Sequence, residues 1–306
     1  MKMNKKIPFV KLMGLTKYYG SYPGVLDINL EINESEIFGF LGPNGAGKST
    51  TIRCIIGLIK PTRGEIVVLG KNSRNKHIEI CKEIGYLPGD VGLYKDLTGN
   101  EYLNHFIKLR KEKNCRKSKE KLLFLKDKFK IDFDKKIGTY SKGMRQIVGI
   151  IQAFMHEPKL IILDEPTSGL DPMMQEEFFN LIIEEKKNDN TIFLSSHILS
   201  EIEKVCDRVA IIKKGKLIHV EEMSSYRSIV GKNIKIEPAE SLEDAFEIIR
   251  EMSEAVDIVL RNGQIEFHYR GEMEHLIRIL ARFKIKDFSC ETPRIEDIFF
   301  KYYEDR

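Results

Sequence analysis

The spacing of hydrophobic and polar positions changes several times along the chain. From Ile7 to Ile32, short alternating apolar segments are broken by turn residues such as Gly20 and Pro23. This pattern predicts antiparallel strands, because alternation with a period of two suits a sheet with one buried face. Ile37 to Leu41 is a continuous apolar run that leads into a glycine-rich turn, and a helical pattern follows from Thr50 to Ile59. The start of the chain therefore predicts a small β layer and then a strand, a loop and a helix.

Four later apolar runs are separated by helical patterns, which predicts an α/β fold with a mainly parallel sheet. They are Glu65 to Leu69, Leu160 to Leu163, Ile192 to Leu194 and Val209 to Ile212. The stretch from Thr98 to Phe129 is polar, favours helix and has no strand pattern. We expect it to belong to a helical subdomain of about residues 90–155.

After about Glu222 the pattern becomes strand, helix, strand, strand, helix, strand. The expected elements are strand Ile234–Glu237, helix Leu242–Met252, strands Val256–Leu260 and Gln264–His268, helix Met273–Phe283 and strand Ile285–Ser289. Ser241 and Asp244 form a capping-box pattern, and Asn262-Gly263 is a tight-hairpin signal. The sequence therefore predicts two domains, residues 1–222 and a small ferredoxin-like α+β domain of residues 223–306.

Composition and charge narrow the class of protein. No stretch approaches the about 18 consecutive apolar residues of a membrane-spanning helix, so we expect a soluble chain. The five cysteines lack a CxxC spacing, which favours neither disulfides nor zinc and fits a reduced, cytoplasmic setting. The net charge of +4 is too small to indicate nucleic-acid binding. Basic residues concentrate between Lys108 and Lys130, either as a solvated helical face or as a surface for anionic headgroups or an acidic partner.

The glycine-rich turn carries the first chemical signal. Gly42-Pro43-Asn44-Gly45-Ala46-Gly47-Lys48-Ser49 fits GxxxxGK followed by Ser or Thr, between the predicted strand and the helix that starts at Thr50. In such a loop the backbone N–H groups wrap phosphate oxygens, Lys48 reaches the β and γ phosphates, and Ser49 binds Mg²⁺. The motif predicts that the chain binds ATP or GTP.

An apolar strand ending in two acids gives the second signal. Leu160 to Leu163 is followed by Asp164 and Glu165. In P-loop proteins the first carboxylate holds Mg²⁺, and a second beside it can orient and deprotonate the attacking water. Although this pattern alone is common in α/β proteins, the two acids match the two roles that nucleotide hydrolysis needs.

A third element, Tyr140-Ser141-Lys142-Gly143-Met144-Arg145-Gln146, lies between the other two in the sequence. Together with the P-loop (the Walker A motif) and the acidic strand end (the Walker B motif), it resembles the signature motif of ABC ATPases. The resemblance covers the whole first domain and includes three further motifs: an adenine-stacking aromatic at Tyr19, with Tyr18 as the alternative, a D-loop at Ser168-Gly169-Leu170-Asp171, and a switch-histidine loop at Ser195-Ser196-His197.

The resemblance implies a P-loop ABC-type nucleotide-binding domain that hydrolyses ATP with Mg²⁺. It further implies that two such domains pack head to tail, so that Ser141 and Gly143 contact the γ-phosphate of ATP held by the Lys48 of another copy. In this arrangement His197 binds the γ-phosphate, and Glu165 activates the attacking water. The expected nucleotide-binding partner is a second copy or a paralogue.

The chain departs from the family pattern in two places. The signature is YSKGM where LSGGQ is usual, so Lys142 and Met144 replace a glycine and a glutamine. The segment Ile84 to Asp90 resembles the Q-loop but has Gly89 in place of the glutamine that touches Mg²⁺. Neighbouring Asp90 either supplies an oxygen to the metal or is a plain surface-turn residue.

These patterns predict the ATP-hydrolysing subunit of an ABC transporter, which powers export through a separate transmembrane permease at the cytoplasmic face of the cell membrane. Pro293 to Phe299 resembles a closing motif of subunits whose permease is a separate polypeptide. The alternative is a soluble ABC ATPase that acts on the ribosome or on nucleic acid. A single cassette without sustained heptads argues against that alternative, and no nucleic-acid partner is expected.

Overall fold

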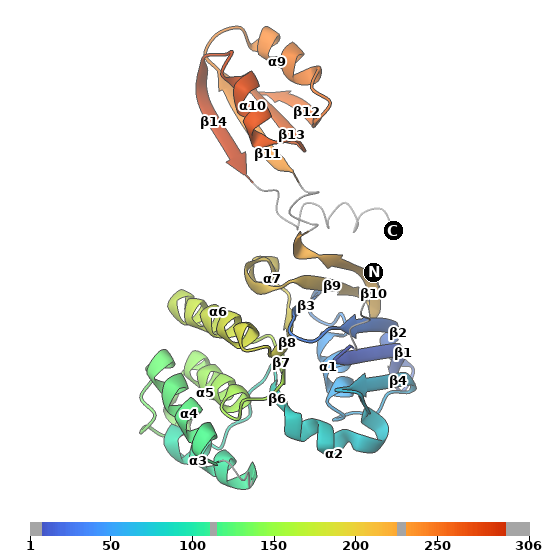
Figure 1. Ribbon diagram of the computed structural model, residues 1–306, viewed down its shortest axis with the longest axis vertical. Coiled ribbons are helices and arrows are strands. Elements are labelled where there is room, and N and C mark those ends of the chain that lie inside the picture. The colour runs from blue at the N-terminus through green and yellow to red at the C-terminus, as the bar shows by residue number, and fades with distance from the viewer. Residues whose placement is uncertain (1–7, 111–114, 225–230, 292–306) are drawn as a thin grey trace, which may run out of the picture. The chain divides into compact units, whose positions relative to one another are not determined.

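The computed structural model describes residues 8–110, 115–224 and 231–291. The chain divides into two compact units, Met1–Glu221 and Glu222–Arg306, and the division falls where the hydrophobic pattern changes (Figure 1). Among the described residues, no helix is both long and apolar enough to cross a membrane.

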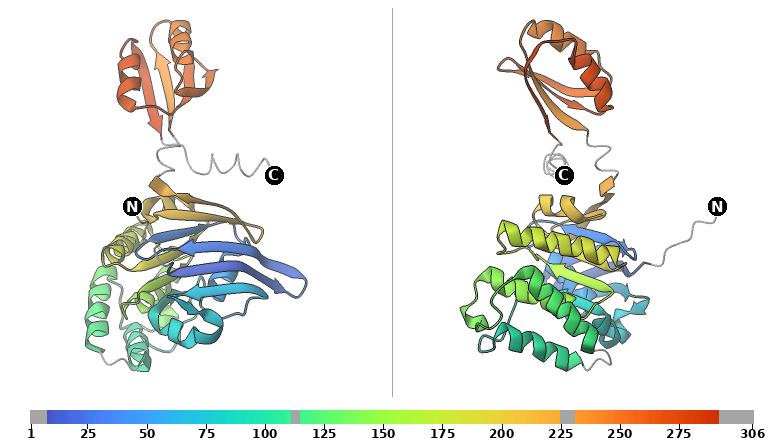
Figure 2. Two further views of the ribbon diagram at one scale, coloured as in Figure 1. Left: turned by 45° about the vertical axis from the view of Figure 1, so that its right-hand side comes forward. Right: turned by 60° about the vertical axis from the view of Figure 1, so that its left-hand side comes forward.

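An antiparallel sheet forms one layer of the first unit (Figure 2). Its strands are β1 (Val10–Tyr19), β2 (Tyr22–Ile32), β4 (Arg63–Val68) and β5 (Lys71–Asn72), in the order β2-β1-β4-β5. The predicted antiparallel layer is confirmed, but the strand expected at Glu65 to Leu69 belongs to it and not to the parallel sheet. The reason lies in burial: Ile66 and Val68 are buried while Val67 between them is only half-buried, as in a strand with one buried face.

A second sheet brings the chemical motifs to one edge. Its strands are β3 (Ile37–Leu41), β6 (Ile84–Leu87), β7 (Leu160–Asp164), β8 (Thr191–Ser196), β9 (Arg208–Lys213) and β10 (Lys216–Glu222), in the order β10-β9-β3-β8-β7-β6. β3 pairs in parallel with β8 and β9, and β7 pairs in parallel with β6 and β8. The carboxyl ends of β3, β8 and β7 are therefore neighbours, and ligands bind at this edge in open α/β sheets.

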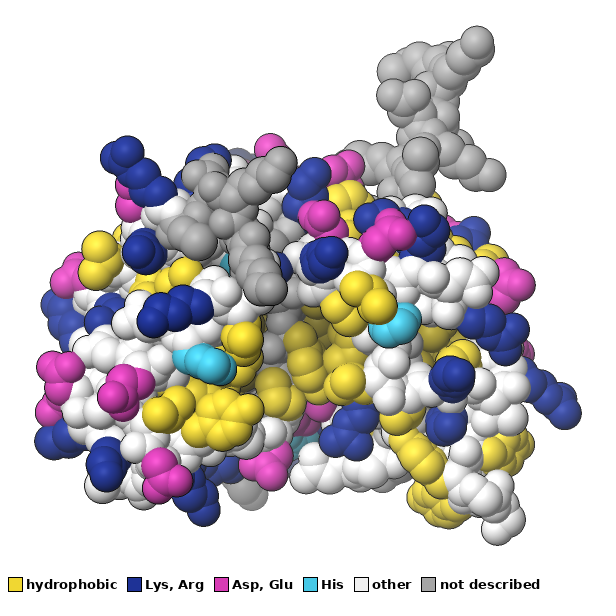
Figure 3. Space-filling model, turned by 90° about the horizontal axis from the view of Figure 1, so that it is seen from below, with side chains coloured by type: hydrophobic (Ala, Val, Ile, Leu, Met, Phe, Trp, Pro, Cys, Tyr) yellow, Lys and Arg dark blue, Asp and Glu magenta, His cyan; other side chains and the backbone are white. Residues whose placement is uncertain are grey.

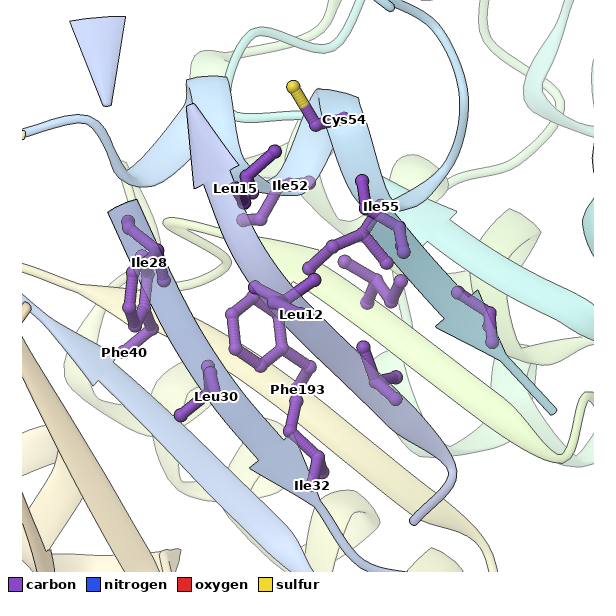
Figure 4. Close-up of a cluster of buried hydrophobic side chains, with 14 of the residues drawn as sticks. Leu12, Leu15, Ile28, Leu30, Ile32, Phe40, Ile52, Cys54, Ile55 and Phe193 are labelled. Carbon is purple, nitrogen blue, oxygen red and sulfur yellow. The ribbon is translucent and has the colours of Figure 1, made fainter. Parts of the chain in front are cut away.

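The helix that follows the P-loop packs into the core of the first unit. This helix, α1 (Lys48–Ile55), buries Ile52 and Ile55 completely. They belong to one cluster with Leu12 and Leu30 of the antiparallel sheet and Phe193 of the second sheet (Figure 4). Burying a side chain of this size stabilises the fold by about 1.5–3 kcal/mol, so the core holds α1 firmly against residues of both sheets.

The remaining helices of the first unit are α2 (Ser73–Glu83), α3 (Gly99–Arg110), α4 (Cys115–Phe129), α5 (Lys142–Phe154), α6 (Pro172–Lys187) and α7 (Leu199–Val205), with the 3-10 turn η1 (Ile137–Thr139). The stretch predicted to be helical thus forms α3 and α4.

Part of the basic run between Lys108 and Lys130 is paired inside the first unit. Lys121 forms an ion pair with buried Glu185 of α6, and Lys128 lies 2.9 Å from Glu184 of the same helix. These lysines do not form a solvated face. Lys111 and Lys113 lie outside the described residues.

The second unit has the element order that its hydrophobic pattern predicts. It contains β11 (Lys232–Pro238), α9 (Leu242–Arg250), β12 (Ala255–Arg261), β13 (Gln264–Tyr269), α10 (Met273–Leu280) and β14 (Ile285–Glu291). The strands are antiparallel in the order β12-β13-β11-β14. Ile234, Ile249, Phe267 and Leu276 are buried in its core, which is separate from that of the first unit.

Two local predictions in the second unit have different outcomes. The tight hairpin is confirmed, because Asn262 and Gly263 both have positive φ, 47° and 79°, between paired Arg261 and Gln264. The capping box is wrong: Ser241 has φ 43°, and its hydroxyl donates to the Asp244 carboxylate instead of capping the backbone. With the backbone of Ser241 in the left-handed region, its side chain lies against Asp244 and makes no hydrogen bond to the helix N–H groups.

Candidate active site

The loop after β3 contains two glycines that the surrounding backbone requires. A Cβ on Gly42 would lie 2.4 Å from the carbonyl oxygen of Ile212. Gly47 caps α1 with φ 109°, and a Cβ there would lie 2.8 Å from the carbonyl oxygen of Gly24. Close backbone packing therefore admits only glycine here. The loop leads directly into the N-terminus of α1, where unpaired backbone N–H groups favour phosphate oxygens.

Lys48 is the first residue of α1, and its side chain is only 5% exposed. Its Nζ donates to the carbonyl oxygens of Gly42 at 2.6 Å and Pro43 at 3.2 Å, and it lies 3.0 Å from Oε1 of Glu165. A buried ammonium needs such partners, because removing a charge from water is costly. The P-loop lysine is therefore held between its own loop and the Walker B acid.

Glu165 lies just after β7 and has an unusual backbone. Its φ of 51° costs a residue with a side chain on the order of 1 kcal/mol, and such strain tends to cluster at active sites. Its N–H group lies 3.1 Å from Ser195 Oγ. Its two carboxylate oxygens face different partners, since Oε1 is 3.0 Å from Lys48 Nζ and Oε2 is 2.6 Å from Nδ1 of His197. The structure thus brings the three predicted catalytic residues together, with Lys48 and His197 each in contact with Glu165.

Asp164 is buried beside them. Its Oδ1 accepts a hydrogen bond from Ser195 Oγ at 2.6 Å, and Ser195 Oγ in turn accepts from the N–H group of Glu165. Among the described residues, the buried Oε1 of Glu165 has the Lys48 ammonium as its ion-pair partner and accepts no further hydrogen bond. Carboxylate oxygens, together with the Ser49 hydroxyl, are the hard donors that Mg²⁺ prefers, so the residues present fit this ion.

Tyr19 reaches the same loop from the end of β1. Its hydroxyl lies 3.5 Å from that of Thr50 in α1, and its ring is 45% exposed. Lys17 Nζ lies 5.5 Å from the centre of the ring, at cation–π distance. Tyr18 instead bonds through its backbone N–H to Thr62. Of the two tyrosines, Tyr19 is the one in contact with the helix that follows the P-loop.

The signature segment lies at the start of α5. Ser141 caps this helix, and its hydroxyl accepts from the N–H group of Met144 at 3.1 Å. A Cβ on Gly143 would lie 2.5 Å from the carbonyl oxygen of Gly169, so this segment packs directly on the D-loop of the same chain. Within the part of the chain that the structure describes, no hydrogen bond joins Ser141 or Gly143 to the P-loop.

Comparison with known proteins identifies the family. The model of the ABC transporter family matches residues 25–168. YhcH of Bacillus subtilis, an uncharacterised ABC transporter ATP-binding protein, is 33% identical over 304 residues, and the match covers 95% of each chain. The chain belongs to the ATP-binding subunits of ABC transporters. Members of this family are ATPases, so we refer to the first unit as the cassette.

Other relatives agree with this assignment. The bacitracin transport ATP-binding protein BcrA of Bacillus licheniformis is 45% identical over 212 residues, which are 68% of each chain. A solved ATP-binding subunit of an ABC transporter is 31% identical with a TM-score of 0.67, over 72% of this chain and 92% of that one. cbiO1 of Clostridium perfringens, part of the transporter complex cbiONQ, is 27% identical with a TM-score of 0.61, over 72% and 90%. The predicted ABC-type fold of the cassette is confirmed.

The residues that depart from the family pattern have defined surroundings in the cassette. Gly89 lies against Asp164, the first of the two Walker B acids, since a Cβ there would be 3.4 Å from Oδ2 of Asp164, whereas its neighbour Asp90 is exposed. Lys142 donates to Ser168 Oγ of the D-loop at 2.7 Å. Nearby on β6, burial raises the pKa of Tyr86, and the Asp164 carboxylate raises it further.

Three polar side chains hold the motifs of the cassette in place, and the sequence patterns assigned a role to none of them. Gln146 of α5 is buried and donates to the carbonyl oxygens of Glu165 at 3.3 Å and Pro166 at 3.0 Å. Thr167 and Glu201 are buried and bond to each other at 2.6 Å. A polar residue on an otherwise apolar helix face was the available signal for Gln146. Nothing local distinguishes Glu201 from its solvent-facing neighbours in sequence.

Proposed function

We propose that this cassette hydrolyses ATP as one half of a head-to-tail dimer and thereby powers export through a separate membrane permease. The observation that supports the chemistry most directly is the Glu165 carboxylate, which lies 3.0 Å from Lys48 Nζ and 2.6 Å from His197 Nδ1. A carboxylate between a phosphate-binding lysine and a histidine is suited to take a proton from water that attacks the γ-phosphate.

The remaining roles follow from the positions of the side chains. The backbone of the P-loop, from Gly42 to Thr50, cradles the phosphates, and Tyr19 stacks on adenine. Ser49 and Asp164 hold Mg²⁺, with Asp90 as a further candidate ligand. When bound, the ion neutralises charge on the β and γ phosphates. His197 contacts the γ-phosphate and orients the water relative to Glu165.

A second cassette completes each site in this proposal. One chain carries one P-loop and one signature segment, and these two segments share no hydrogen bond among the described residues. The hydroxyl of Ser141, the backbone of Gly143 and the N-terminus of α5 together make a set of donors suited to a phosphate of the opposite copy. Because this chain carries the catalytic residues Lys48, Glu165 and His197, we favour a homodimer over a pair with a paralogue.

The permease is a separate transmembrane chain, and the cassette binds it at the cytoplasmic face of the membrane. The relative BcrA is named for bacitracin transport, and cbiO1 belongs to a transporter complex. Hydrophobic side chains gather around a hollow on the face shown in Figure 3, with Lys and Arg at its margins. An apolar surface of this kind is expected where another chain covers it. The motif Pro293 to Phe299 lies outside the described residues.

The second unit, in this proposal, is an accessory domain with a ferredoxin-like fold. Its βαββαβ order and its antiparallel sheet β12-β13-β11-β14 support this assignment, because the two central strands, β11 and β13, are the first and third along the chain. Together with the cassette of residues 1–222, it accounts for the two-domain organisation.

The proposed function can be tested with the purified chain and a membrane protein encoded next to it. The chain alone should hydrolyse ATP in the presence of Mg²⁺. When both are reconstituted into proteoliposomes, candidate substrates added on the side of the cassette should stimulate hydrolysis and be moved across the membrane. Hydrolysis that responds to ribosomes or DNA, and to no membrane protein, would instead support the soluble alternative.

A further inference from the structure

Glu201 of α7 is a buried carboxylate that joins two loops of the site. Only 5% of it is exposed, and each of its oxygens accepts a hydrogen bond from a different hydroxyl group. Thr167 Oγ1 donates to Oε1 at 2.6 Å, and Ser196 Oγ donates to Oε2 at 2.6 Å. Both hydroxyls are buried as well. Hydrogen bonds of this length to a carboxylate are charge-assisted and stronger than bonds between neutral groups.

The two hydroxyls belong to the segments that carry the proposed base and the proposed γ-phosphate sensor. Thr167 lies two residues after Glu165, in a turn closed by the N–H group of Ser168 and the carbonyl oxygen of Glu165 at 3.2 Å. Ser196 directly precedes His197. Through one side chain, Glu201 therefore connects the turn after Walker B with the switch-histidine loop.

Ser196 extends the same connection to the P-loop. Its carbonyl oxygen accepts from the N–H group of Gly42 at 3.2 Å, and its hydroxyl accepts from the N–H group of Ile198 at 2.9 Å. The backbone on both sides of His197 is thus tied to groups that Glu201 holds. Losing the Glu201 carboxylate would remove the acceptor of the buried Thr167 hydroxyl and would leave the Ser196 hydroxyl only the Ile198 carbonyl oxygen at 3.2 Å, so both loops would be freer to shift.

We propose that Glu201 is a positioning residue for ATP hydrolysis. It fixes the positions of Glu165 and His197 relative to each other, so that both can act on the same water and γ-phosphate. This inference rests on the proposed function, because it assigns Glu201 a part in that reaction. Glu201 itself touches Thr167 and Ser196 and not the reacting groups, so its effect is geometric. A displacement of about 1 Å in a catalytic group can reduce turnover about 100-fold.

The test compares kcat and KM for MgATP in the purified full chain. Glu201→Ala should lower kcat about 10- to 100-fold while KM stays within about threefold, because the P-loop and Tyr19 still bind the nucleotide. Glu201→Gln keeps the shape of the side chain and one acceptor oxygen. Its kcat should recover at least half of the loss in log kcat that Glu201→Ala causes. Thr167→Val removes one of the two donors and should lower kcat without unfolding the chain.

A double variant and a matched control distinguish a positioning role of Glu201 from a general effect on stability. In Glu201→Ala protein, adding Thr167→Val should lower kcat by no more than about twofold, since the bond it removes is already lost. Glu185→Gln alters another buried carboxylate, on α6, which accepts hydrogen bonds from Asn190 and from Lys121 of α4; this change should leave kcat unchanged. The proposal is overturned if folded Glu201→Ala protein keeps wild-type kcat, if KM rises as much as kcat falls, or if Glu185→Gln has the same effect. One further outcome would refute this inference and leave the proposed function intact. In that outcome the wild-type chain hydrolyses ATP, Glu165→Gln abolishes the activity, and the Glu201 variants hydrolyse ATP as the wild type does.

Discussion

The Lys48 ammonium and the Glu165 carboxylate lie 3.0 Å apart as a largely buried ion pair. The lysine that we propose to bind phosphate is therefore directly paired with the proposed base. Phosphate oxygens and Glu165 compete for the same ammonium, so the charge of Glu165 should influence nucleotide binding as well as turnover.

The first prediction concerns this pair. Glu165→Gln should reduce turnover at least about 100-fold, because an amide cannot accept the proton of the attacking water. ATP binding should be retained or become tighter, since the variant no longer offers Lys48 a competing negative charge. Phosphate release and calorimetric titration with ATP measure the two effects, and gel filtration should show an ATP-bound dimer. Glu176→Gln, an exposed change on α6, is the control and should behave as wild type; wild-type turnover in Glu165→Gln protein would exclude Glu165 as the base.

The second prediction concerns the signature segment. Ser141→Arg should leave ATP binding by the monomer largely intact but block dimer closure and hydrolysis, because the long side chain would occupy the phosphate position of the opposite copy. Ser141 also caps α5, so the change should lower the free energy of unfolding by about 1 kcal/mol. Ser141→Thr keeps the hydroxyl and serves as the control. Normal hydrolysis by Ser141→Arg protein would argue against the head-to-tail arrangement.

The third prediction concerns the position beside Asp164. A side chain on Gly89 would start 3.4 Å from Oδ2 of Asp164, at ordinary contact distance, so the site has room for it. Gly89→Gln should lower the Mg²⁺ concentration for half-maximal hydrolysis at least about twofold, because the amide oxygen adds a hard ligand. Asp90→Ala is the companion variant. A raised Mg²⁺ requirement would support Asp90 as a ligand, whereas an unchanged one would assign it to the surface turn.

The fourth prediction compares a buried ion pair of α4 with an exposed one. Lys121→Met removes the partner of buried Glu185 and should lower the free energy of unfolding by about 3 kcal/mol. Arg116→Met breaks an exposed pair with Glu120 and should change it by less than about 1 kcal/mol. Urea denaturation of both variants measures the difference. Equal, small effects would mean that Lys121 belongs to a solvated face after all.

Much of the fold of both units can be predicted from sequence because the signals are local. The glycines of the P-loop, the apolar strand before Asp164 and the hairpin turn at Asn262-Gly263 each depend on a few consecutive residues, whose backbone conformation or burial period decides the outcome. The same locality explains why the order of elements in the second unit is correct. It also explains one error, since the capping pattern at Ser241 omits the competing bond to Asp244.

Tertiary structure decided which distant residues meet. The partner of the strand at Arg63–Val68 depends on what covers its faces, and a short apolar run does not encode that. The contact of Lys48 with Glu165, the pairing of Lys121 with Glu185 and the bonds of Glu201 all join residues that lie on different elements. The sequence by itself determined the chemistry available at each motif, because residue type and local backbone suffice for that. The parallel order of β3, β8 and β7 determined their mutual geometry, because hydrogen bonds between strands bring together chain ends that are far apart in sequence.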